Sequence, residues 1–303
     1  MFKILALKNI FSNRELAVGF WLFVLLLYAL SKKDIRKSLL DIIKIFFSKK
    51  FIGWHISMLL YVLLIIFILF KIGFWEFRLL KDTIIWYISV AIVTSIKSIG
   101  EAKDMKYFEN IIKDNVKIVI ILEFIINLYN FSLICEIILI PVISFLYLFK
   151  MSFELKTKYQ NENYKSIIKL LNIITAVIGI YILFYSTIKF LSDIKNIVFL
   201  DLFKDLILPS ILSIMFVPYV YLFVLYSTYE KVFIILKYKK TIDDKYRFLL
   251  YFRIILFCKF NIVKVNNFIN YSKIMYNYIK SKDDINLLFK NYKTNVITYN
   301  VDK

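Results

Sequence analysis

The stretch FIGWHISMLLYVLLIIFILF, from Phe51 to Phe70, decides the fold class. It contains no Asp, Glu, Lys or Arg, and it is flanked by Lys49, Lys50 and Lys71. A helix rises about 1.5 Å per residue, so about 20 apolar residues cross the ~30 Å hydrocarbon core of a bilayer. The length of this stretch and its charged ends therefore predict a membrane-spanning helix.

Further stretches of the same kind extend this prediction along the chain. The mean hydropathy is +0.70, and 60% of the 303 residues are apolar, whereas a soluble domain averages about 45–50%. The sequence therefore predicts an all-α integral membrane protein, folded as a polytopic helical bundle. The other predicted single spans are Leu16–Ser31, Thr83–Ile96, Leu170–Ile188 and Ile207–Ser227.

The stretch Ile118–Phe149 is too long for one upright span and short for two. Cytoplasmic segments carry an excess of Lys and Arg, and this bias separates the two interpretations. If the stretch is a hairpin that turns near Asn130, then 32 of the 41 basic residues fall on one side of the membrane. If it is a single span, the segments with 5 and 15 basic residues move to the other side of the membrane, and the strong bias toward one side is lost. The hairpin predicts about seven spans, with the N-terminus outside and the C-terminus cytoplasmic; a single span would give six.

An alternative for the first apolar stretch is the core of a cleaved signal peptide, Leu16–Leu30. Cleavage there would place the seven basic residues that follow outside the membrane, against the charge bias. We therefore interpret this stretch as a span.

The chain divides into a transmembrane helical domain, 1–227, and a basic cytoplasmic tail, 228–303. The tail carries 15 basic and 6 acidic residues. Leu249–Cys258 is apolar apart from Arg253 and is too short to span, and apolar residues between Tyr271 and Phe289 have loosely helical spacing. We expect two or three amphipathic helices, packed on the membrane face or on one another.

Charge indicates which partners the tail and the first loop favour. The net charge is +19, yet only 5 of the 41 basic residues are Arg, the residue that nucleic-acid readers prefer. This excess of Lys favours an anionic lipid leaflet over nucleic acid, although part of it is typical of AT-rich coding. The linker Ser31–Lys50 carries one apolar stripe opposite its lysines and predicts a helix in the inner interface.

Composition excludes several classes of site. His55 is the only histidine, which removes multi-histidine metal sites, and Cys135 and Cys258 lie too far apart in sequence for a CxxC motif. None of the five glycines forms a phosphate-binding loop motif. A hydrolytic centre would have to use carboxylates alone, which disfavours an enzyme. We expect no cofactor and no metal.

Ionisable and amide side chains inside the predicted spans are the candidate functional residues, because they are costly at membrane depth. Glu123, Asn127 and Asn130 follow one another at i, i+4 and i+7 and share one helix face. His55 lies at a depth similar to that of Glu123, and two interpretations stay open: a His–Glu pair that relays protons or binds a cation, or a neutral hydrogen-bonded pair or two unrelated residues satisfied by Ser and Tyr hydroxyls. Glu136 lies just beyond the predicted turn, where we expect it to reach the outer water.

Pro141 and Pro218 fall inside predicted spans. Each proline frees a carbonyl of the preceding turn and kinks its helix. Kinked helices are common in transporters and channels but also in inert bundles, so both interpretations stay open.

Two functions from different classes fit these features. The first is a non-enzymatic channel, transporter or membrane subunit with a polar path past Glu123. The second is a membrane anchor or scaffold that recruits a soluble partner or anionic lipid through its basic tail. A homo-oligomer is compatible with either.

Overall fold

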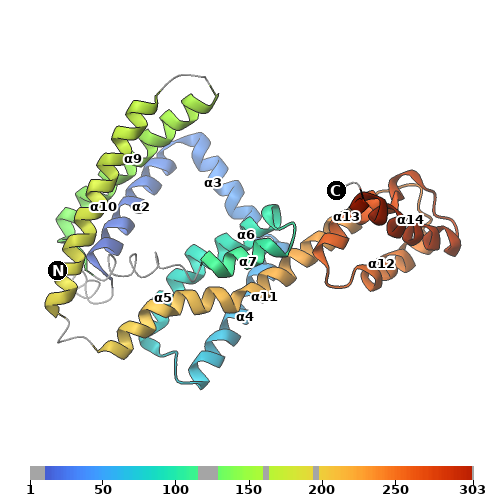
Figure 1. The fold of residues 1–303 in the computed structure, drawn as a ribbon, viewed down its shortest axis with the longest axis horizontal. Helices are drawn as coiled ribbons and strands as arrows, with labels where there is room; N and C mark the ends of the chain where they lie inside the picture. The colour runs from blue at the N-terminus through green and yellow to red at the C-terminus, as the bar shows by residue number, and fades with distance from the viewer. Residues whose placement is uncertain (1–10, 115–128, 160–163, 194–197, 302–303) are drawn as a thin grey trace. The chain divides into compact units, whose positions relative to one another are not determined.

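The structure is a computed structural model, and it describes residues 11–114, 129–159, 164–193 and 198–301 (Figure 1). No strand occurs among these residues, and a single isolated bridge pairs Ile242 with Ile279. The all-α fold class is confirmed. The described α-helices are α2 (Asn13–Ser31), α3 (Lys33–Phe46), α4 (Lys49–Lys71), α5 (Leu80–Trp86), α6 (Ile92–Glu101), α7 (Met105–Asp114), α9 (Leu133–Tyr159), α10 (Lys165–Asp193), α11 (Phe199–Lys237), α12 (Asp244–Cys258), α13 (Ile262–Ser272) and α14 (Lys282–Val301).

Six helical segments of the described chain are long and apolar enough to cross a membrane by length and composition. In α2, α9 and α10 only 6% of the most apolar window is buried inside the protein. Exposed apolar surface on this scale indicates contact with lipid or with other protein. The segments are Asn13–Ser31, Lys49–Lys71, Phe77–Glu101, Leu133–Thr157, Lys165–Asp193 and Phe199–Lys237.

The segment Phe77–Glu101 is not a uniform α-helix. It begins with the 3-10 turn η1 (Phe77–Leu79) and contains the π-helical turn η2 (Tyr87–Ala91) between α5 and α6. The predicted span Thr83–Ile96 lies inside this segment. Single π-turns inside helices are rare and often occur at functional sites.

The stretch Ile118–Phe149 is not one continuous helix. Residues 129–132 are non-helical, and α9 begins at Leu133. The Ser132 hydroxyl accepts from the backbone N–H of Cys135 (3.5 Å) at this helix start, as side chains of N-terminal cap residues do. The first arm of the predicted hairpin lies outside the described residues, so the six helical segments do not fix the number of spans.

The chain forms two compact units. Unit 1 comprises residues up to Ser57 together with Ile118–Leu206, and unit 2 comprises Met58–Lys117 together with Ile207–Lys303. Unit 1 therefore contains α2, α3, α9 and α10. The apolar stripe predicted for the linker lies on α3, where every side chain is at least partly exposed.

Helix α11 is the central element of unit 2. Its buried side chains recur every four residues, at Leu208, Leu212, Phe216, Val220 and Val224, and this spacing places them on one face of the helix. Around that face the Trp86 indole donates to the Ser213 hydroxyl (2.9 Å), and the Ser98 hydroxyl donates to Tyr107 (3.1 Å). Helix α11 continues to Lys237, so the predicted domain boundary at 227/228 falls within a helix.

The helices of the basic tail pack on one another. Buried side chains from α12, α13 and α14 form one core, in which the Phe268 ring lies 5.6 Å from Phe289 and 5.9 Å from Tyr292, centroid to centroid. Packing of the tail helices on each other, one of the two arrangements expected from the sequence, is observed. The buried apolar residues are Leu250, Ile254, Cys258, Ile262, Val265, Phe268, Ile274, Ile279, Ile285, Leu288 and Tyr292.

The tail forms the amphipathic helices that its sequence predicts, but Tyr271–Phe289 is not one continuous helix. Helix α13 ends at Ser272 because Lys273 adopts a left-handed conformation with φ 53°, and such a residue terminates a helix. A short 3-10 turn, η4 (Ile274–Tyr276), follows, and α14 begins only at Lys282, where Ser281 and Asp284 form reciprocal capping hydrogen bonds (3.1 and 2.8 Å). The backbone N–H of Lys280 also donates to the Asp284 carboxylate (2.9 Å), and this bond together with those of Ser281 holds the pKa of Asp284 below its ordinary value.

The shared core predicts that one buried phenylalanine sets the stability of the tail. Phe268→Ala should lower the free energy of unfolding of these helices by about 3–5 kcal/mol, because it leaves a cavity among aromatic rings. Phe248→Ala on α12 is the matched control, because Phe248 is 82% exposed. Hydrogen exchange of the detergent-solubilised chain measures both. Equal protection of α13 and α14 in the two variants would contradict a common core.

Candidate functional site

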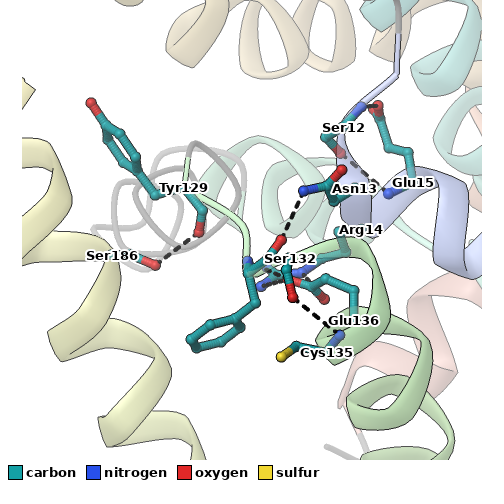
Figure 2. A network of polar contacts seen from close by, with 10 residues as sticks. Ser12, Asn13, Arg14, Glu15, Tyr129, Ser132, Cys135, Glu136 and Ser186 are labelled. Carbon is teal, nitrogen blue, oxygen red and sulfur yellow. Dashed lines mark hydrogen bonds and ion pairs between the residues drawn. The ribbon is translucent and has the colours of Figure 1, made fainter. Parts of the chain in front are cut away.

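A buried ion pair joins the first turns of α2 and α9 (Figure 2). Arg14 donates from Nε to Glu136 Oε2 (3.2 Å) and from Nη2 to Glu136 Oε1 (3.1 Å). The backbone N–H of Phe131 donates to Glu136 Oε1 (3.0 Å). Glu136 is 0% exposed and the Arg14 side chain is 20% exposed. Two parallel hydrogen bonds of this kind are the strongest arrangement that Arg and carboxylate adopt.

The local sequence places both partners at helix N-termini. Helix α2 starts with a capping box, in which the Ser12 hydroxyl accepts from the Glu15 N–H (3.2 Å) and the Glu15 carboxylate accepts from the Ser12 N–H (2.7 Å). Glu136 lies in the first turn of α9, where the helix dipole favours negative charge. Helices α2 and α9 therefore begin at the same end of unit 1 and run side by side (Figure 1).

A second contact between these helices satisfies the carbonyl freed by Pro141. Proline has no N–H, so Pro141 leaves the carbonyl of Ile137, four residues earlier, without its helical donor. The Trp21 indole of α2 donates to that carbonyl (2.8 Å). Helix α9 continues through Pro141, and this proline therefore creates an acceptor that α2 uses.

The segment that leads into α9 completes the network. Asn13 donates from Nδ2 to the carbonyl of Phe131 (2.9 Å), and the Ser186 hydroxyl of α10 donates to the carbonyl of Tyr129 (3.2 Å). The Phe131 ring stacks on Tyr185 with the centroids 4.3 Å apart. Backbone groups next to apolar helices thus find partners inside unit 1, as they must where water is absent.

This arrangement connects α2 with α9 and with the segment before α9. The Glu136 carboxylate accepts hydrogen bonds from Arg14 and from the Phe131 N–H, and the adjacent guanidinium balances its charge. Glu136 was a sequence-predicted candidate, but its expected access to outer water is wrong because it is fully buried. Sequence reasoning missed Arg14 and Trp21, whose partners lie more than 100 residues away; the only signal was an Arg at the start of an apolar stretch.

The other predicted polar residues are not brought together among the described residues. The His55 ring lies 4.2 Å from the Phe46 ring and 4.3 Å from the Trp54 ring, and its buried Nε2 atom has no hydrogen-bond partner in the described part of the chain. Asn130 precedes α9 and is partly buried. Glu123 and Asn127 lie outside the described residues, so the predicted pairing of His55 with Glu123 stays a prediction.

Pro218 lies inside α11 in unit 2, as predicted, and α11 also contains Pro209. The Tyr61 hydroxyl of α4 donates to the carbonyl of Met215 (3.1 Å), in the turn before Pro218. The carbonyl that Pro218 leaves without its helical donor is that of Ile214, four residues earlier, so this contact differs from that of Trp21 at Pro141.

No group of three or more His, Cys, Asp or Glu that could hold a metal ion occurs among the residues that the structure describes. No family model matches the chain, and no curated protein or solved structure matches it significantly. Its function must therefore be argued from its own residues.

The ion pair predicts an asymmetric response to mutation. Arg14→Met should destabilise unit 1 by about 3–5 kcal/mol, because it strands a buried carboxylate, whereas the double variant Arg14→Met, Glu136→Met should recover most of the loss. Thermal melting in detergent, followed by size-exclusion chromatography, measures both.

Lys44→Met is the matched control, since Lys44 pairs with Asp41 in an exposed position (3.3 Å), where such pairs contribute about 0–1 kcal/mol. A double variant no more stable than Arg14→Met alone would show that the carboxylate is not neutralised chiefly by Arg14.

Proposed function

We propose that this chain is a multi-pass membrane protein that holds a folded, basic helical domain at the cytoplasmic face and uses it to recruit an acidic soluble partner. Six helices of sufficient length and apolarity support the membrane part. The recruitment part is supported by the common core of α12, α13 and α14, because a folded domain holds its basic side chains in fixed positions. We call residues 238–301 the C-terminal domain.

The C-terminal domain is fixed to α11 rather than tethered loosely. The Tyr251 ring of α12 stacks on Phe233 of α11 with the centroids 4.6 Å apart, and Arg247 donates to the carbonyl of Lys237. Lys239, in the connection after α11, donates to the carbonyls of Ile274 and Asn277. Burial lowers the pKa of Lys239, because desolvation disfavours its charged form.

The charge of the C-terminal domain is segregated along its sequence. No Asp or Glu occurs between Asp244 and Asp283, a stretch that carries eight basic residues. Lys290 and Lys293 on α14 are exposed. A surface of one sign attracts a partner of the opposite sign and raises the association rate, so the domain is suited to an acidic protein.

The arrangement of α2 and α9 supports seven spans. Two spans that begin at the same face of a membrane must be separated by an even number of crossings. Between the starts of α2 and α9 the described chain offers three, namely α2, α4 and Phe77–Glu101. We therefore place a fourth crossing between Asp114 and Leu133, which keeps the C-terminus cytoplasmic if the N-terminus is outside.

Transport past Glu123 is the second candidate. The π-helical turn Tyr87–Ala91 supports it, because such turns are frequent at functional sites. Among the described residues Glu136 is a buried carboxylate, but it pairs with Arg14. Glu136 therefore gives the transport proposal no further support. The two candidates differ in whether function depends on Glu123 or on the C-terminal domain.

Copurification in mild detergent tests recruitment. We expect the full chain to retain an acidic protein that is lost when the chain ends at Lys240 and when Lys290→Glu and Lys293→Glu are combined, because charge reversal repels an acidic surface. Lys44→Glu on α3 is the control for net charge. Mass measurement of each complex also reports homo-oligomers. Retention of the same partner by the chain ending at Lys240 would contradict recruitment by the C-terminal domain.

A further inference from the structure

Helix α12 runs back along α11 toward the predicted membrane segment. From the middle of α12 to the turn that follows it, Tyr251 contacts Phe233, the carbonyl of Lys259 accepts from the Tyr229 hydroxyl (2.7 Å), and the carbonyl of Phe260 accepts from the Tyr221 hydroxyl. The contacts thus descend α11 in steps from 233 to 221. The turn after α12 therefore lies beside the end of the predicted span Ile207–Ser227.

The two tyrosines hold this turn in an unusual shape. Lys259 has φ 48°, a backbone conformation that residues with a side chain seldom adopt. Asn261 then caps α13 by accepting from the Lys264 N–H (2.9 Å). Four successive features therefore fix residues 259–262: the positive φ of Lys259, two tyrosine hydroxyls and a helix cap.

This fixed turn presents apolar side chains outward. Phe260 is 70% exposed, Leu256 is 55% exposed and Val263 is 42% exposed. Lys259 and Lys264 flank them and are exposed as well. An interfacial surface combines such apolar groups with lysines that reach anionic headgroups.

The aspartates of the C-terminal domain lie at its opposite end, among basic residues. Asp243 and Asp244 lie at the start of α12, and Asp283 and Asp284 lie in the first turn of α14, next to Lys245 and Lys282 in sequence. These two starts are joined by backbone hydrogen bonds between Asp243 and Ile279 (3.1 Å) and between Ile279 and Thr241 (3.0 Å). Helix α12 separates this end from the turn by about 22 Å at 1.5 Å per residue. The acidic residues of the domain therefore lie away from the predicted span.

We propose that the α12–α13 turn is a lipid-inserting tip, in which Phe260, Leu256 and Val263 enter the leaflet and Lys259 and Lys264 bind anionic lipid headgroups. This rests on the proposed function, which places the C-terminal domain on a membrane face. The occupant is lipid because the turn lies at the level of the predicted span and no acidic residue lies within it. Insertion at this point orients the domain, with α14 left free for a soluble partner.

Site-directed fluorescence in proteoliposomes tests the tip. Cys135 is exposed and is replaced by Ser, whereas Cys258 is kept, because burial raises the pKa of its thiol to about 12 and leaves little reactive thiolate. An environment-sensitive NBD label is attached in turn to Phe260→Cys, to Phe248→Cys and to Leu222→Cys. Phe248 is the matched control on the same helix, and Leu222 is an exposed position within the predicted span.

With lipid-borne nitroxide quenchers in phosphatidylcholine–phosphatidylglycerol vesicles, we expect the labels at 260 and 222 to lose most of their fluorescence and the label at 248 to keep it. Quenching at 222 with none at 260 would overturn the tip and leave the membrane protein standing. No quenching at 222 would overturn the membrane placement itself. A blue-shifted but unquenched label at 260 would mean that protein, either a partner or a second copy, covers the turn, and would also overturn the tip.

A separate comparison tests whether Lys259 and Lys264 bind anionic lipid headgroups. Quenching at 260 should weaken in vesicles of phosphatidylcholine alone, and likewise in the variant that combines Lys259→Gln with Lys264→Gln. Lys290→Gln combined with Lys293→Gln removes the same charge from α14 and should leave quenching unchanged. Equal quenching with and without anionic lipid would overturn the assignment of the two lysines to headgroups.

Discussion

The pairing of Glu136 with Arg14 is the contact on which the arrangement of unit 1 depends. An apolar helix can satisfy its interior backbone groups, but the polar groups at its ends and at prolines need donors from elsewhere when water is excluded. In unit 1 these donors come from the neighbouring helix: the guanidinium for the carboxylate, and the Trp21 indole for the carbonyl freed by Pro141. The same two contacts fix α2 and α9 with their N-termini at one end, which supports an additional crossing between Asp114 and Leu133.

The predictable parts of this fold are those that depend on residues close to one another in the sequence. The span around Phe51–Phe70 follows from its length and lack of charge, and the turn near Asn130 follows from charge bias and is matched by the start of α9 at Leu133. The ion pair was not predictable, because Arg14 and Glu136 are 122 residues apart and neither residue carries a motif. The end of α13 was not predictable for a different reason. The left-handed backbone at Lys273 does not change the spacing of the apolar residues, so this spacing predicts a helix that continues past Lys273.

The C-terminal domain shows how a basic tail gains a definite orientation. Its helices share one core, and three tyrosines, Tyr221, Tyr229 and Tyr251, each connect it to α11 or to the turn beyond α12. With the domain held in this way, its exposed apolar turn and its aspartates lie at opposite ends of α12. The exposed lysines of the turn and those of α14 also lie on different elements, which fits the separate lipid and protein contacts that we propose for them.

The side of the membrane on which α7 and the α9–α10 connection lie tests the central claim most directly. Reporter fusions after Glu109 and after Tyr164 are separated by α9 and by the crossing proposed between Asp114 and Leu133. Two crossings return the chain to the side from which it started, so we expect both fusions to report the cytoplasm, as a fusion after Val301 should. If the fusions after Glu109 and Tyr164 report opposite sides, only α9 crosses between them, and α2 and α9 cannot begin at the same face of the membrane.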